Sequence, residues 1–193
     1  TMNEEEYEGV KSGVSVGGSP GVRDARARDS RTKRDDELAR ALRKSGVHAF
    51  AKSWYAQGLF TTLVAHPRFG GVDGLALRRA RTADTPGAAD ALAECLSAAS
   101  PGRQAHVWDA LYRLNGKSLF ITGERDSKFA TLAREMRDAT GDARGVVDIK
   151  NAGHAAHLEA PEAVVVHLTR FFADMATTWY ALLENFYCIL FIR

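Results

Sequence analysis

The sequence predicts an α/β fold built on a parallel sheet, and three observations lead to that prediction. The final third alternates strand and helix, over residues 117–122, 127–139, 145–149 and 161–175. Such alternation is typical of a parallel sheet. A further short strand is predicted near residue 15, where Val14 and Val16 alternate with small residues before a Gly/Pro turn. Between these strands the chain is mostly helical, which is the order expected of a helical insertion in an α/β sheet.

Composition fits one globular domain or a large part of one. The chain has 193 residues, of which 45% are hydrophobic and 26% are charged, and its net charge is +2. A charge this small gives no general indication of a nucleic-acid or membrane partner. Cys95 and Cys188 lack the spacing of a disulfide framework or a structural zinc site. No apolar stretch is long enough to span a bilayer, and the acidic start lacks the features of a targeting segment.

The helical block opens with a strongly charged stretch. Residues 23–44 hold nine basic and five acidic side chains. They settle into a helix that Asp35 or Asp36 is expected to cap and that Gly46 is expected to end. A solvated helix face explains these charges better than nucleic-acid binding does, because no aromatic residues interleave them.

Three further helical segments are predicted in this block. One covers 47–65, with a possible bend at Gly58, and another begins at Thr85 and Pro86, which are read as a cap followed by a first-turn proline. The last covers about 101–114, where Val107, Leu111 and Leu114 align.

Two candidate catalytic residues follow neighbouring strands. Asp126 comes after the strand at 117–122, and His154 comes after the strand at 145–149. The carboxyl ends of parallel strands meet at one sheet edge, where a carboxylate can orient an imidazole for general-base or nucleophilic catalysis. On their own these two residues are weak evidence, because a loop aspartate such as Asp126 is usually a helix cap and a lone histidine such as His154 is more often structural. His154, His157 and Glu159 do not match the HExxH metal motif.

Several motifs together resemble the SHCHC synthase family of menaquinone and phylloquinone biosynthesis. They are SPGV, RARDSRTKRDDELA, SWYAQGLF, HPRF, SAASPGRQAHVWDAL, GERDSKF and AGHAAHLEAP, in this order over residues 14–175. The family consists of lyases with the α/β-hydrolase fold and includes the C-terminal domain of plant PHYLLO-type proteins. The resemblance implies a helical cap over about 24–115 and C-terminal strands and helices over about 117–175.

The resemblance also implies site residues. Asp126 becomes the acid and His154 the base of a catalytic triad. Arg31 and Trp54 match substrate-binding positions, and Arg78 is the expected second arginine for a substrate carboxylate, with Arg79 and Arg81 as alternatives. The substrate is a small tricarboxylate, which suits the bidentate fork of arginine. No metal or organic cofactor is implied.

The third triad member is the main departure from the family pattern. The family places its nucleophile elbow, GxSxG, ahead of the position of residue 14, and only thirteen residues precede it here. Ser19 is unsuitable because Pro20 has no N–H for an oxyanion hole, and Ser15 is read as part of a strand because no helix follows it directly. We therefore expect the C-terminal part of the fold without its N-terminal half, inactive alone, with the other half or further domains as possible partners.

The implied reaction is elimination of pyruvate to give SHCHC. A generic α/β-hydrolase acting on esters or carbon–carbon bonds is the first alternative, and a non-catalytic fragment is the second. The expected compartment is the cytoplasm for a bacterial source and the chloroplast for a photosynthetic eukaryote. Residues 1–13 remain an unassigned leader, and the apolar tail, 176–193, lies outside the family pattern.

Overall fold

A three-stranded parallel sheet organises the molecule. The computed structural model describes residues 13–83, 85–114, 118–141 and 145–185, with side chains in the last helix described as far as residue 175. The strands are β1 (Gly13–Val16), β2 (Ser118–Gly123) and β3 (Val146–Ile149), in the order β1-β2-β3. Ser15 lies opposite Phe120, and Ile121 lies opposite Val147. The predicted α/β class and parallel sheet are confirmed.

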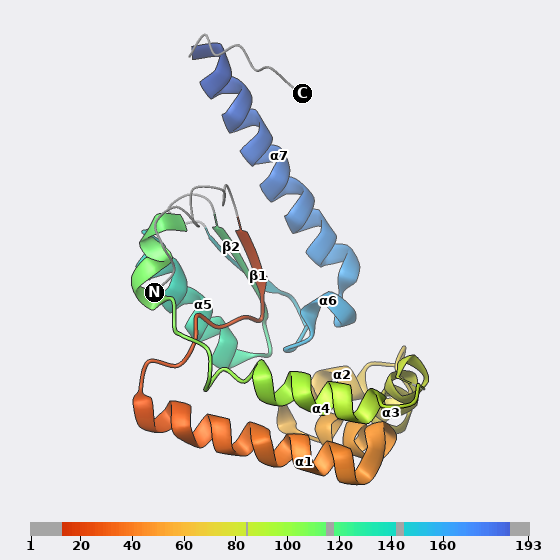
Figure 1. The fold of residues 1–193 in the computed structure, drawn as a ribbon. Helices are drawn as coiled ribbons and strands as arrows, with labels where there is room; N and C mark the ends of the chain where they lie inside the picture. Colours follow the sequence, from red (N-terminus) through yellow and green to blue (C-terminus); the bar gives the residue numbers. More distant parts are fainter. Residues whose placement is uncertain (1–12, 84, 115–117, 142–144, 186–193) are drawn as a thin grey trace, which may run out of the picture.

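The central strand β2 is buried along its whole length because helices cover both faces of the sheet (Figure 1). Leu119 and Ile121 point to one face and pack with Val164 of α7 (Pro161–Asn185), which follows the short helix α6 (Ala156–Glu159). Phe120 points to the other face. There it packs against α5 (Ser127–Thr140) and the 3-10 helix η3 (Trp108–Leu114). This alternation is the period-two pattern of a strand.

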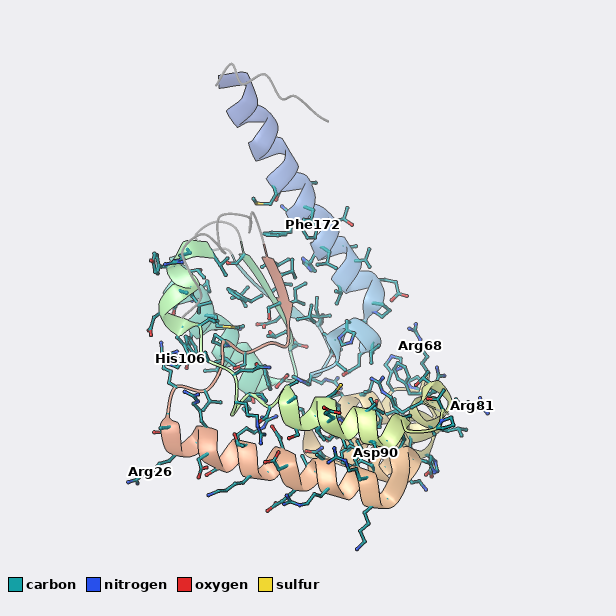
Figure 2. All side chains as sticks on the ribbon, in the orientation of Figure 1. Arg26, Arg68, Arg81, Asp90, His106 and Phe172 are labelled. Carbon is teal, nitrogen blue, oxygen red and sulfur yellow. The ribbon has the colours of Figure 1, made fainter. Side chains whose placement is uncertain are left out.

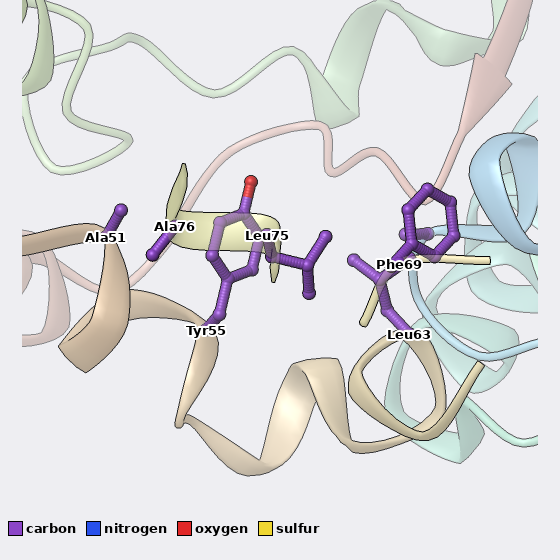
Figure 3. Packing of buried hydrophobic residues seen from close by; sticks show 7 residues of the cluster. Ala51, Tyr55, Leu63, Phe69, Leu75 and Ala76 are labelled. Atoms are coloured by element: carbon purple, nitrogen blue, oxygen red, sulfur yellow. The ribbon is translucent and has the colours of Figure 1, made fainter. Parts of the chain in front are cut away.

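The chain between β1 and β2 forms a separate helical unit at the carboxyl ends of the strands (Figure 1). We use "helical unit" for α1 (Ala25–Tyr55), the 3-10 turn η2 (Gly58–Phe60), α2 (Thr61–Ala65), α3 (Gly71–Thr82) and α4 (Ala88–Ala98). Figure 3 shows its main hydrophobic cluster, in which Tyr55, Leu63 and Phe69 are buried. A residue from outside the unit, Ala155, belongs to the same cluster.

Helix α1 begins earlier than the sequence indicated. Asp24 caps it, with its carboxylate accepting a hydrogen bond from the Ala27 N–H at 2.8 Å, so the predicted caps Asp35 and Asp36 lie inside the helix. Of the five acidic residues in 23–44, only Asp24 precedes the first helical residue, Ala25. The predicted break at Gly46 is confirmed. There φ is 76° and ψ is 167°, and the chain turns into a second arm, 47–55.

Two other helix predictions need correction, and one helix was not predicted. Helix α4 begins at Ala88 after Gly87, not at Thr85 and Pro86, because Gly87 adopts the left-handed conformation ahead of the first turn. Only 108–114 of the predicted segment 101–114 is helical, and it is a 3-10 helix. Helix α3 was not predicted, because Gly70, Gly71 and Gly74 at its start are typical of a turn rather than of a helix.

Two features of the C-terminal region bear on the sequence predictions. No helix in the described part of the chain is long and apolar enough to cross a membrane. Helix α7 extends beyond the sheet, and Phe172 on it is 51% exposed (Figure 2). The side chains of the predicted apolar tail and Cys188 lie outside the described residues.

Candidate functional site

The structure brings Asp126 and His154 together at the carboxyl edge of the sheet. Asp126 follows β2 and His154 follows β3, and Nδ1 of His154 lies 2.7 Å from Oδ2 of Asp126. The Asp126 side chain is 6% exposed and the His154 side chain is 21% exposed. One member of the pair is therefore withdrawn from solvent, and the other is accessible.

Asp126 has two contacts that the sequence presented as alternatives. Its Oδ1 accepts a hydrogen bond from the Phe129 N–H at 3.4 Å and so caps α5, while its Oδ2 contacts His154. One carboxylate thus serves as a helix cap and as the partner of an imidazole.

The loops that carry the pair are bonded to each other. Glu124 accepts a hydrogen bond from the Asn151 N–H at 2.8 Å, and the Arg125 guanidinium donates to the Asn151 side-chain oxygen at 3.1 Å. The Arg125 N–H also donates to the Ala152 carbonyl at 2.9 Å. These bonds hold the aspartate loop and the histidine loop in fixed register, which preorganises the pair.

The His154 ring lies between aromatic neighbours. Its centroid is 4.4 Å from that of Phe129 and 6.3 Å from that of Phe60. The end of β1 closes another side, since a methyl group added at Gly17 would lie 3.2 Å from the ring carbon Cε1. Among the described residues, Nε2 of His154 has no hydrogen-bond partner. With Nδ1 donating to the carboxylate, Nε2 can accept a proton from a bound molecule.

An open cavity of about 460 Å³ lies inside the helical unit, between the two arms of α1, the end of α3 and α4. Its lining is mostly apolar and comprises Leu42, Val47, Phe50, Ala51, Trp54, Tyr55, Arg79, Thr82, Ala83, Leu92 and Leu96. Phe60 lies between the Trp54 side of this cavity and the Asp126–His154 pair, because its ring centroid is 6.2 Å from that of Trp54 and 6.3 Å from that of His154. A mostly apolar pocket with one or two polar groups is typical of a small-molecule site.

The predicted arginines have different surroundings. Arg31 donates through Nε to both oxygens of Asp35, at 3.0 and 2.8 Å, and Asp35 is 2% exposed. Arg78 donates to the Arg68 carbonyl at 3.1 Å and does not line the cavity. Arg81 lies on the outer side of the helical unit (Figure 2). Arg79 lines the cavity and donates through Nε to the Tyr55 hydroxyl at 3.1 Å.

Neither serine from the GxSxG-like strings lies in a nucleophile elbow. Ser15 is inside β1, as predicted, and α1 begins only at Ala25. The Ser19 hydroxyl accepts a hydrogen bond from the Gly21 N–H at 3.2 Å and so closes a turn. The described residues also contain no group of three side chains placed to hold a metal ion.

Two aromatic residues of the site were not proposed from the sequence. Phe60 and Phe129 both contact His154, and both fall within motifs that carried the family resemblance, SWYAQGLF and GERDSKF. These two motifs were therefore the sequence feature from which Phe60 and Phe129 could have been proposed. Which of their residues faces the histidine depends on how η2 and α5 are oriented.

The chain is similar to proteins of quinone biosynthesis, although no family model matches it. It is 34% identical over 169 residues to "Protein PHYLLO, chloroplastic" of Arabidopsis thaliana, covering 84% of this chain and 9% of that protein. It is 35% identical over 157 residues to the 2-succinyl-6-hydroxy-2,4-cyclohexadiene-1-carboxylate (SHCHC) synthase of Salmonella arizonae, covering 81% of this chain and 56% of that enzyme. These similarities confirm the family resemblance seen in the motifs.

A solved structure from the same family has a similar fold. MenH from S. aureus superposes with a TM-score of 0.74 at 20% identity, over 86% of this chain and 60% of that one. The match confirms that the described elements form a portion of the α/β-hydrolase fold. The chain spans about half the length of the Salmonella synthase.

Proposed function

Because the chain is related in sequence to the SHCHC synthases over 81% of its length, we propose that it forms the cap and the acid–base part of a lyase that eliminates pyruvate from a cyclohexene tricarboxylate to give SHCHC. The Asp126–His154 contact is the observation that supports this most strongly. The α1–α4 unit is the proposed cap. The compartment would be the chloroplast in a photosynthetic eukaryote and the cytoplasm in a bacterium.

In the proposed mechanism His154 is the general base. Its Nε2 removes a proton from the substrate ring, and the electrons of that C–H bond drive cleavage of the ring C–O bond. The leaving group departs as the enolate of pyruvate and takes one proton, which the imidazolium can return, to become pyruvate. Asp126 holds Nδ1–H and stabilises the imidazolium that forms. Phe60 and Phe129 restrict the ring orientation, which keeps Nε2 directed at the bound substrate.

Arginines supply the proposed carboxylate contacts. Arg79 is favoured over Arg78 for one substrate carboxylate because it lines the cavity beside Trp54. In the described part of the chain no carboxylate pairs with Arg79, so its terminal nitrogens can form a bidentate contact with an anion. Arg31 is proposed for another carboxylate, and its fixed bond to Asp35 presets its orientation.

The decisive experiment measures two reactions side by side. The chain is assayed alone and fused to the part of the Salmonella synthase that it does not cover, following pyruvate release from the tricarboxylate and cleavage of a p-nitrophenyl ester. We expect pyruvate release from the fusion. Ester cleavage without pyruvate would favour a generic hydrolase instead, and neither reaction in a folded fusion would favour a non-catalytic chain.

A further inference from the structure

Glu159 joins the histidine loop to the helical unit. It is the last residue of α6, and its two carboxylate oxygens have different partners. Oε2 accepts a hydrogen bond from the Gly153 N–H at 2.9 Å, directly before His154. Oε1 accepts one from the Thr62 hydroxyl at 3.1 Å, and Thr62 lies in α2. A single carboxylate therefore bridges the backbone beside the catalytic imidazole and a helix of the other part of the molecule.

The residues on either side of His154 both touch the helical unit. A side chain at Gly153 would collide with the Thr62 hydroxyl, so the loop and α2 are in close contact. Ala155 is 6% exposed and is buried with Tyr55 and Leu63, the cluster shown in Figure 3. His154 is thus held between two backbone positions that are fixed by contact with the same helices.

The ring of His154 also contacts the helical unit directly, so a movement of the unit would displace it. Phe60, which packs edge-on against the imidazole, belongs to η2, and α2 follows it without a break. A shift of α2 would therefore reach His154 by two routes, through the Phe60 ring and through Thr62 and Glu159.

We infer that Glu159 is a positioning residue, which couples the placement of the helical unit to the orientation of His154. Its carboxylate transmits the position of α2 to the Ala152–Gly153 peptide, directly ahead of His154, and so sets how the imidazole meets Asp126. Hydrogen bonds to a charged acceptor are stronger than those between neutral groups, which suits this role. The significance for catalysis rests on the proposed function of His154, but the coupling itself is measurable without turnover.

The test uses NMR on the full chain with the substitution Thr62→Val, which removes the hydroxyl but keeps the shape of the side chain. We expect exchange of the Gly153 amide to accelerate about tenfold, because the carboxylate loses the partner that holds it in place. The Hε1–Cε1 signal of His154 should shift as well. Thr62→Ser restores the hydroxyl and should restore both signals.

Thr61→Val is the matched control. The Thr61 hydroxyl donates to the Gly58 carbonyl at 2.8 Å within the helical unit and has no bond to Glu159. We expect this variant to leave both signals unchanged. If Thr62→Val does not fold, Glu159→Gln provides the second variant, because its amide keeps the size of the side chain but has one acceptor oxygen for two donors.

The inference is overturned if Gly153 exchange in Thr62→Val, or in Glu159→Gln where the first variant is unfolded, stays within about twofold of the parent. It is also overturned if Thr61→Val produces the same change or if Thr62→Ser fails to restore the parent signals. An absence of pyruvate release in the fusion would contradict the proposed lyase and would leave these signals as they are, so the two failures are distinguishable.

Discussion

Asp126 has a structural role and a proposed catalytic role, because its carboxylate caps α5 and also contacts His154. Asparagine can still accept the hydrogen bond from the Phe129 N–H, but it cannot stabilise an imidazolium as a carboxylate does. Substitution of this one residue therefore separates the two roles.

We predict that Asp126→Asn in the active fusion lowers kcat by about 10³- to 10⁴-fold while the melting temperature stays close to that of the parent. Pyruvate release and thermal unfolding are the two measurements. Asp126→Ala is the comparison, since it loses both roles and should also lower the melting temperature. An Asn variant with full activity would remove Asp126 from the mechanism.

Gly123 allows the loops that carry Asp126 and His154 to approach each other. It ends β2, and a side chain there would collide with the backbone carbonyls of Ala152 and Gly153. Because backbone cannot move aside as a flexible side chain can, any side chain at this position pushes the histidine loop away from Asp126.

Gly123→Ala should therefore destabilise the protein by about 3 kcal/mol or more, since overpacking against a rigid backbone is costly. Urea unfolding measures the change. The matched substitution is Gly13→Ala, in strand β1, where an added methyl group meets no atom within 4 Å. A loss of stability as large in Gly13→Ala as in Gly123→Ala would show that the close approach of the loops is not the cause.

At the scale of elements, a polar network joins α1 to the end of α4 and to the segment that follows it. Asp36 accepts hydrogen bonds from the Ser97 hydroxyl at 2.6 Å and from the Arg103 guanidinium at 2.8 Å. The bond from Arg103, followed by that from Ser97, lowers the pKa of Asp36 from its ordinary value of 3.8 to about 2. The folded protein therefore binds a proton at Asp36 less readily than the unfolded chain does.

This lowered pKa determines how the stability contributed by Asp36 changes with pH. A lowered folded-state pKa contributes stability that is complete above the unfolded value of 3.8 and is lost as the pH falls through about 2. We predict that Asp36→Asn melts at a lower temperature than the parent at pH 6 and that the difference shrinks toward pH 2. Asp29→Asn, which removes an exposed pair with Lys33, should change the melting temperature little at either pH. A difference for Asp36→Asn that does not vary with pH would contradict the assignment.

Elements differ in how well the sequence predicted them. The strands and α5 were predicted closely, because alternation marks β1, short apolar runs mark β2 and β3, and Asp126 stands directly before the helical segment. Helix α3 was missed, and with it the direction of Arg78, Arg79 and Arg81, because three arginines within four positions point to different sides of a helix. Which of the three arginines lines the cavity depends on how α3 packs against α1, and a local sequence pattern does not predict that packing.

At the scale of the whole molecule, the sequence predicted the meeting of Asp126 and His154 but not the cavity near them. The pair follows from topology alone, since adjacent parallel strands end at one edge. The cavity depends on Gly46, where α1 changes direction, so that Leu42 in one arm and Trp54 in the other line the same space. A glycine predicts a break in a helix but not the angle of the next arm.

The edge of the sheet leads to a prediction for the whole molecule. Among the described strands β1 pairs on one side only, with β2. The Gly17 N–H donates to the Ile121 carbonyl at 2.9 Å, so the alternation of a parallel ladder directs the N–H of Ser15 toward β2 and those of Val14 and Val16 toward the open side. Unpaired strand edges promote association between chains.

We therefore expect the chain to self-associate through β1 as its concentration rises from ~10 µM to ~1 mM, the range in which exposed edges drive aggregation. Light scattering after size exclusion gives the mass, and amide exchange locates the contact. The amides of Val14 and Val16 should gain protection with concentration, while that of Ser15, already bonded to β2, provides an internal control that stays protected throughout. A monomer at every concentration, or association that leaves Val14 and Val16 in rapid exchange, would show that this edge does not mediate contacts between chains.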